Sequence, residues 1–173
     1  MSWSARGMVG GLVAATLILT GCSTPPSAAA IVGDQQISHT SVRQTASALV
    51  AASGAEADVA LRQAAYDLLM GEASDQILAK RDLVVTDAER AELLATSETA
   101  NAIANTADGA EWGRSVAQTY LAIERLGSDA YASDLAEIGI VVNPRYGSWD
   151  PAQVTVVDSA LSAPFDPLSV PLR

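Results

Sequence analysis

The sequence predicts a mainly α-helical protein, a helical bundle with a short two-stranded sheet formed by N- and C-terminal strands. Three observations predict this fold. All seven prolines of the 173-residue chain lie outside residues 27–143, and proline breaks helix interiors. The proline-free stretch is rich in Ala, Leu, Glu and Gln, which favour helices. Short β-branched segments lie near its two ends, at residues 31–32 and 140–142, and we expect them to pair.

The predicted domain, residues 29–150, opens with extended chain. A short strand ends at Val32, Gly33-Asp34 makes a turn, and the chain returns extended to Ile37. Ser38 is the expected N-cap of a first helix, which ends at Ser53-Gly54. Its apolar residues recur at helical spacing on one face: Val42, Ala46, Leu49 and Val50.

A longer helix is expected from near Asp58 to Lys80 or Arg81. Its predicted apolar stripe is Val59, Tyr66, Met70, Ala73 and Ile77, with Leu69 beside it. Gly71 lies in the middle of this helix, where a glycine marks either a close helix contact or a bend.

Three shorter helices follow. Thr86 and Glu89 have the spacing of a capping box, which predicts a helix from there to about Thr96. Residues 101–109 have only a weak pattern. A fourth helix, closing near Gly127, carries Trp112, Val116, Tyr120 and Ile123. A short fifth helix carries Tyr131, Leu135 and Ile138 and ends at Gly139, before the closing strand.

The N-terminus has the pattern of a signal peptide, residues 1–21. Arg6 precedes an uncharged, mostly apolar segment of thirteen residues, Met8 to Thr20. A helix of that length rises about 20 Å. This is less than the roughly 30 Å of a hydrocarbon core, so it is a poor permanent span.

The segment ends in Leu19-Thr20-Gly21-Cys22, which resembles the lipobox of bacterial lipoproteins. The resemblance implies cleavage between Gly21 and Cys22, a diacylglycerol thioether on Cys22, and acylation of the new N-terminus. Two or more acyl chains anchor a protein stably. We therefore expect a lipidated tether, residues 22–28, at the extracytoplasmic face of the cell membrane. The alternatives are an ordinary secretory signal cut near residues 27–30 and an uncleaved anchor.

Composition excludes several classes of function. The net charge of −10 makes a nucleic-acid partner unexpected, because binding phosphates needs clustered Lys and Arg. One Cys and one His cannot build a disulfide framework, a structural zinc site or a Cys–His nucleophile pair in the mature fold. We expect no metal, no enzyme activity and no cofactor other than the lipid on Cys22.

Two groups of titratable residues could have either a chemical or a structural role. His39 follows the Ser38 cap, and no nucleophile or orienting acid can be named for it, so we expect an exposed first-turn residue. Asp87, Glu89 and Glu92 offer carboxylates for acid–base chemistry or a hard cation. Acidic residues in a first helical turn are also favoured by the helix dipole, and we interpret this cluster as structural.

Three stretches carry a resemblance to a known family: IVGDQQIS at 31–38, LVVTDAE at 83–89 and VNPRYGSWD at 142–150. These three stretches occur in this order, C-terminal to the lipobox, and together they make residues 29–150 resemble the SurA N-terminal-type domain. This is the helical chaperone domain of SurA- and PrsA-like extracytoplasmic proteins, and the chain looks closest to actinobacterial lipoprotein versions. It departs at Gly33-Asp34, where the family usually has Asn-Gly. It also leaves no room for the parvulin prolyl-isomerase domain of many relatives, so that activity is not expected.

Aromatic residues supply the remaining candidates. Arg145, Tyr146 and Trp149 could hold an extended peptide by stacking and hydrogen bonding. Alternatively, Tyr146 and Trp149 cap the bundle and Arg145 pairs with a carboxylate, the interpretation that we favour. Trp112 and Tyr120 share a helix face and are expected in the core.

The resemblance implies a membrane-anchored chaperone that binds unfolded or exported polypeptides in a cleft between helices. The alternative is a non-catalytic envelope module with one dedicated protein partner. Met70 is the only methionine after the predicted signal peptide, and that scarcity counts mildly against a general holdase. An exposed apolar patch larger than a few hundred Å² would favour the chaperone, and a mostly charged surface the module.

Overall fold

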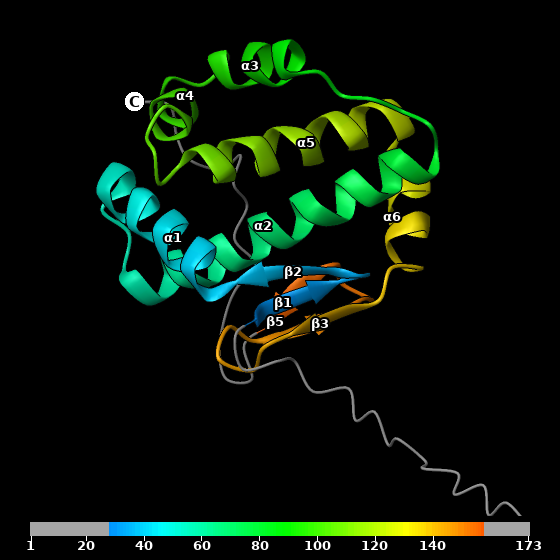
Figure 1. Cartoon of the computed structure of the whole chain (residues 1–173), viewed down its shortest axis with the longest axis horizontal. Helices are drawn as coiled ribbons and strands as arrows, with labels where there is room; N and C mark the ends of the chain where they lie inside the picture. The colour runs from blue at the N-terminus through cyan, green and yellow to red at the C-terminus, as the bar shows by residue number, and fades with distance from the viewer. Residues whose placement is uncertain (1–27, 158–173) are drawn as a thin grey trace, which may run out of the picture.

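A computed structural model describes residues 28–157. The predicted signal peptide, its cleavage and lipidation site at Gly21 and Cys22, most of the predicted tether, and residues 158–173 lie outside the described residues. The described part contains six helices and five short strands (Figure 1). It is mainly α, as the sequence predicted.

One sheet joins the two ends of the domain. β1 (Ala28–Val32) lies between β2 (Gln35–Ser38) and β3 (Ile140–Val142), and both pairings are antiparallel. The pairing of β1 with β3 confirms the predicted contact between the two ends. The sheet has three strands rather than two because the chain reverses at Gly33. This residue has a φ of 60°, which glycine adopts without steric cost. The return segment then runs back along β1 as β2.

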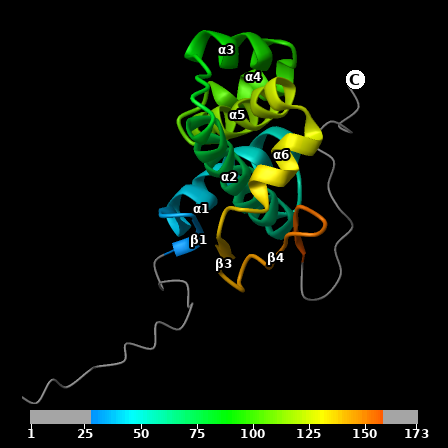
Figure 2. The same cartoon turned by 90° about the vertical axis from the view of Figure 1, so that its right-hand side faces the viewer.

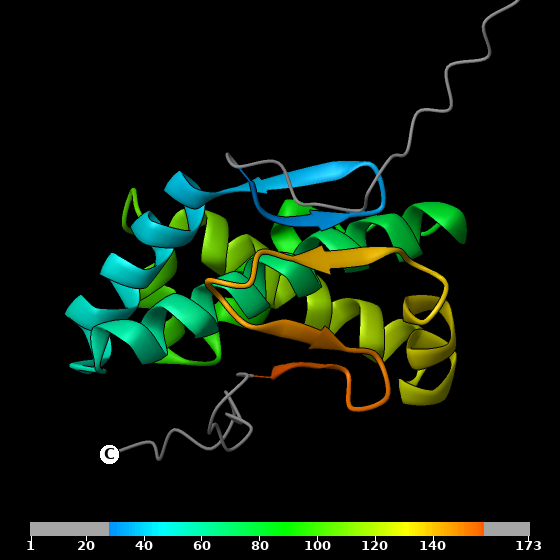
Figure 3. The same cartoon turned by 90° about the horizontal axis from the view of Figure 1, so that it is seen from below.

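A separate hairpin follows β3. β4 (Ser148–Asp150) pairs antiparallel with β5 (Thr155–Val157). Figure 3 shows this hairpin beside β3, on the same side of the helices. The sequence predicts a flexible C-terminal tail over residues 151–173, and β5 contradicts this prediction as far as Val157. The Asp150 carboxylate orders the connecting turn by accepting a hydrogen bond from the Ala152 N–H at 2.9 Å. Three-residue strands around such a turn are too short to produce a recognisable alternating pattern.

The first two helices match their predicted ranges. α1 (His39–Ser53) begins at Ser38, whose hydroxyl accepts from the Ser41 N–H, and ends at Gly54 with φ of 70°. α2 (Ala57–Lys80) is the longest helix. One predicted stripe residue is misplaced, because Val59 is exposed and Ala60 is buried in its place.

The remaining helices are shorter. α3 (Asp87–Ala95) starts with the predicted capping box. α5 (Ala110–Leu126) and α6 (Ser128–Leu135) correspond to the predicted fourth and fifth helices. α4 (Glu98–Ala104) was not predicted, because a seven-residue helix with a single buried residue has no apolar stripe to detect.

The elements stack in layers around α2 (Figure 1). The three-stranded sheet covers one side of α2, α5 crosses its other side, and α3 and α4 lie over α5. α6 closes one end against α2 and α5 (Figure 2). There the Arg81 guanidinium donates to the buried Asp134 carboxylate at 2.6 Å.

The α2–α5 crossing depends on small residues. A Cβ atom added at Gly71 would lie 2.4 Å from the Cβ and 2.6 Å from the Cα of Ser115 on α5. The glycine therefore marks a close helix contact, one of the two roles predicted for it. This approach sets the distance between α2 and α5.

Candidate functional site

The three candidate peptide-binding residues differ in burial and in contacts. Tyr146 is buried, and its hydroxyl lies 2.8 Å from Nδ1 of His39. Trp149 is half-buried on β4 opposite Val156. Arg145 is exposed in the β3–β4 connection, and within residues 28–157 no ion pair involves it. Tyr146 thus has the packing role that we favoured, whereas the expected pairing of Arg145 with a carboxylate is absent from that range.

His39 also differs from its prediction. It is half-buried rather than exposed, and its ring packs against the Tyr146 ring with centroids 5.5 Å apart. This contact ties the start of α1 to the loop after β3. A first-turn position predicts exposure only when nothing packs over that end of the helix, and the closing loop does so here.

The acidic cluster at the start of α3 is structural. The Glu89 carboxylate accepts from the N–H and the hydroxyl of Thr86, each at 2.7 Å, and pairs with Arg125. These hydrogen bonds and the arginine lower the pKa of Glu89 to about 2. Asp87 pairs with Arg90. Glu92 is exposed, and no group of three metal-ligating side chains occurs among the described residues.

A pocket of about 300 Å³ is the strongest candidate site. It lies where α2, α5 and α6 meet the turn before β5. Three of the four tyrosines in the chain line it, together with Met70. Its lining residues are Tyr66, Asp67, Met70, Val116, Thr119, Tyr120, Ile123, Ser128, Tyr131, Ala132 and Val154. An apolar wall with a few converging polar groups is the usual make-up of a ligand pocket.

The sequence pattern identified part of this lining but assigned it to the core. Tyr66 and Met70 belong to the predicted α2 stripe, and Val116 and Tyr120 to the α5 stripe. Met70 and Trp112 are buried as expected, but Tyr66 and Tyr120 are only half-buried and border the pocket. Periodicity shows that residues share a face, and it does not show whether the facing elements close over that face.

Asp67 is the polar group that the sequence reasoning missed. It is 5% exposed and borders the pocket from α2. Its two carboxylate oxygens accept from Gln63 Nε2 and Trp112 Nε1, both at 2.7 Å. Burial raises the pKa of Asp67 to about 6, against the opposing effect of those two hydrogen bonds.

A sequence signal for Asp67 exists. It continues a series of small or apolar residues at helical spacing, all of them buried: Ala60, Ala64, Gly71, Ser74 and Leu78. An aspartate on the buried face of a helix is rare unless it is paired or functional. A search for apolar positions alone passes over Asp67, because a stripe is recognised by its hydrophobic members.

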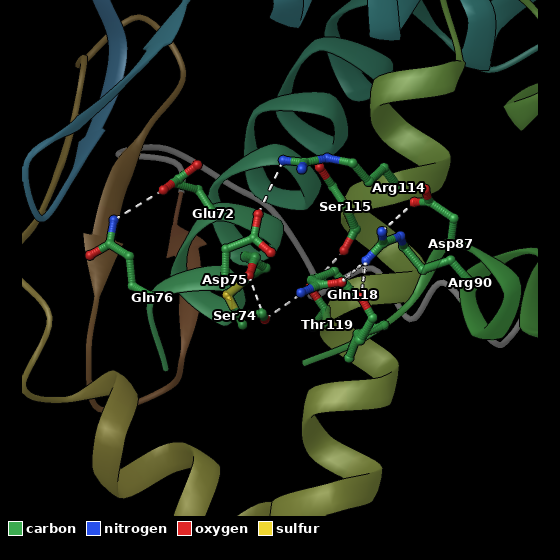
Figure 4. A network of polar contacts seen from close by, with 12 residues as sticks. Glu72, Ser74, Asp75, Gln76, Asp87, Arg90, Arg114, Ser115, Gln118 and Thr119 are labelled. Atoms are coloured by element: carbon green, nitrogen blue, oxygen red, sulfur yellow. Dashed lines mark hydrogen bonds and ion pairs between the residues drawn. The ribbon is translucent and has the colours of Figure 1, made fainter. Parts of the chain in front are cut away.

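Hydrogen bonds between hydroxyl groups hold the side chain of Tyr131, which lines the pocket. The Tyr131 hydroxyl lies 2.8 Å from Ser74 Oγ, and Ser74 donates to the Met70 carbonyl at 2.7 Å. Burial raises the pKa of Tyr131 to about 12. Figure 4 shows Ser74 and Thr119 facing one another between α2 and α5, at 3.3 Å. These contacts hold the Tyr131 side chain in a fixed position.

The β4–β5 hairpin forms part of the rim of the pocket through Val154. The Tyr66 hydroxyl donates to the Val154 carbonyl at 3.4 Å. Val154 has a φ of 52°, and a β-branched residue in the left-handed region costs on the order of 1–3 kcal/mol. Strain of this kind persists only where surrounding contacts hold it, and it concentrates at binding sites.

A second hollow, of about 410 Å³, lies between α1 and α4. Alanines make up most of its lining, with Asp108 as its one charged residue: Ser47, Ala48, Ala51, Ala52, Ala102, Ile103, Thr106, Ala107 and Asp108. Its lining among the described residues has neither aromatic rings nor a buried ionisable group, so this hollow is the weaker candidate.

Comparisons with known proteins give no further assignment. No family model matches the chain, and searches of the curated proteins and of the solved structures found no match. Within residues 28–157 no helix has the length and apolar character needed to span a bilayer.

Proposed function

We propose that this domain is a non-catalytic polypeptide-binding module of the cell envelope. One observation carries the proposal: three of four tyrosines and Met70 gather in one pocket between the helices. Tyrosine gives a large contact area for little conformational entropy and is enriched at protein interfaces. A pocket of about 300 Å³ suits one or two side chains of a bound segment.

A single dedicated partner fits the surface better than a general chaperone does. Among the described residues only Val59 and Val84 are exposed large hydrophobic side chains. Promiscuous binders use broad or adaptable apolar surfaces, often rich in methionine. The chaperone implied by the SurA-type resemblance remains the second candidate, supported by the position of the pocket between helices.

The site of action in this proposal is the extracytoplasmic face of the membrane, with the domain held there by acyl chains on Cys22. The test is labelling with a radioactive fatty acid, comparing the full-length protein with Cys22→Ser. Label on the wild type alone supports the anchor. Equal label on both proteins, or none on either, would remove lipidation from the proposal.

Photo-crosslinking tests polypeptide binding and separates the two candidates. A photoreactive phenylalanine analogue replaces Tyr120 at the pocket or, as the matched control, exposed Val84. A dedicated partner gives one discrete crosslinked band from position 120 and little from position 84. A continuous smear from position 120 would favour the chaperone. Equal crosslinking from both positions contradicts binding at the pocket.

A further inference from the structure

We propose that the pocket binds an alkylammonium group, the lysine side chain of the partner polypeptide, with Asp67 as its counter-ion. This inference rests on the proposed function and names the chemistry that the pocket recognises. It starts from the position of Asp67, which is 5% exposed yet borders the pocket.

The charge of Asp67 is hydrogen-bonded but not neutralised. Both donors to its carboxylate, Gln63 and Trp112, are uncharged. Within residues 28–157 no Lys, Arg or His lines the pocket and no ion pair involves Asp67. Buried charges are ordinarily paired, because an unpaired one loses its solvation without recovering it. A cation entering the pocket would supply the missing partner.

The rest of the lining suits a cation on an apolar stem. Met70, Val116, Ile123 and other apolar residues line the walls. A lysine side chain carries four methylene groups below its ammonium, so its stem can contact these walls while its tip reaches Asp67. Tyrosine rings add attraction for a cation through their negative faces, and aromatic pockets commonly recognise ammonium groups for this reason.

The hydrogen bonds to Asp67 also fix its geometry. Each oxygen already accepts one bond of 2.7 Å, so the carboxylate is held in one orientation before a ligand arrives. Each oxygen keeps further capacity to accept, which an ammonium with three donors can use. The net charge of −10 adds long-range attraction for a basic partner.

The test uses the mature chain with Cys22→Ser and Trp149→Phe, which leaves Trp112 as the only tryptophan after the predicted signal peptide. Because the Trp112 indole N–H donates to Asp67, its fluorescence reports on that carboxylate. Short capped peptides carrying either lysine or norleucine at one position are titrated. These side chains differ in the ammonium but share the apolar stem. We expect the lysine peptide to bind about 30-fold more tightly.

Two variants identify the responsible group. Asp67→Asn is expected to remove the preference for lysine while leaving norleucine binding unchanged. Asp75→Asn is the matched control, since it removes the same charge from the same helix but at a residue paired with Arg114 outside the pocket. It should keep the preference. Loss of the preference in Asp75→Asn, or its retention in Asp67→Asn, would overturn the role of Asp67.

The outcomes also separate this inference from the proposed function. If the two peptides bind equally well, the alkylammonium proposal fails and polypeptide binding stands. If neither peptide binds while position 120 still crosslinks one partner, the alkylammonium proposal again fails alone. Free n-butylamine binding as tightly as the lysine peptide would keep the ammonium chemistry but overturn lysine of a polypeptide as its source.

Discussion

Two carboxylates, Asp67 in the pocket and Glu89 at the start of α3, receive similar hydrogen bonds and respond in opposite ways. Asp67 is buried among neutral donors, and its pKa rises to about 6. Glu89 accepts from Thr86 and pairs with Arg125, and its pKa falls to about 2. Hydrogen bonds favour the charged form at both sites. The burial of Asp67 without a cation decides the difference.

The comparison distinguishes two uses of charge in one helical bundle. At Glu89 the charged form closes a helix end and links α3 to α5, so it favours the folded state. At Asp67 the charged form disfavours folding and is retained beside a pocket. A group that costs stability and borders a pocket is a candidate functional group.

The largest effect is expected from breaking the α2–α5 contact that shapes the Asp67 region. In Gly71→Ala the new methyl meets the backbone of Ser115, so we expect a loss of about 3 kcal/mol in unfolding free energy. Urea denaturation of the Cys22→Ser chain measures it. Gly139→Ala is the control, because a Cβ there meets no atom within 4 Å. A loss in Gly71→Ala as small as the loss expected in Gly139→Ala would show that α2 and α5 can move apart at little cost.

Asp67→Asn is expected to stabilise the protein by about 3 kcal/mol at pH 7, since the pKa of Asp67 rises from 3.8 to about 6 and one pKa unit corresponds to about 1.4 kcal/mol. The folded pKa lies above the ordinary value of 3.8, so the folded state binds more protons between these values. Wild-type stability therefore gains from Asp67 as pH falls from about 6 to about 4. Chemical denaturation at several pH values should show this gain in the wild type and not in Asp67→Asn. A destabilised variant would mean that the charge is structural.

Glu89→Gln is expected to change stability in the direction opposite to Asp67→Asn, because the pKa of Glu89 is lowered and that of Asp67 is raised. The folded pKa of Glu89 lies below its ordinary value of 4.5, so its contribution is present above that pH and is lost as pH falls toward 2. We expect a modest loss of stability at pH 7 and a weaker acid dependence below pH 4.5. Thermal melts at pH 7, 4 and 3 measure both. An unchanged acid dependence would contradict the assigned hydrogen bonds.

The smallest effect is expected at the pocket rim. Tyr66→Phe removes a long hydrogen bond of 3.4 Å to Val154, so global stability should change by less than about 1 kcal/mol. Faster hydrogen exchange is expected in the β4–β5 hairpin, because that contact helps to hold Val154 at its φ of 52°. Unchanged exchange there would show that the strain is maintained by other contacts.

Local patterns predicted the helices that have long stripes or caps. Ser38, Thr86 and Gly54 mark helix ends through their own side chains or backbone freedom, so these boundaries follow from nearby residues. α4 and the β4–β5 hairpin were missed because each is too short for periodicity. The candidate site was predicted least well. Arg145, Tyr146 and Trp149 are neighbours in sequence but differ in burial and contacts.

The sequence by itself determined the helical class, the short extended segments near residues 31–32 and 140–142, and the residues that share each helix face. These depend on spacing within a segment, which the chain carries locally. Only the tertiary structure decided that Tyr66, Asp67, Tyr120 and Tyr131 surround one pocket. Their convergence depends on how α2, α5 and α6 cross, and on Gly71 allowing α2 and α5 to approach. Burial without a cation then sets the charge behaviour of Asp67, because solvation depends on all the surrounding elements together.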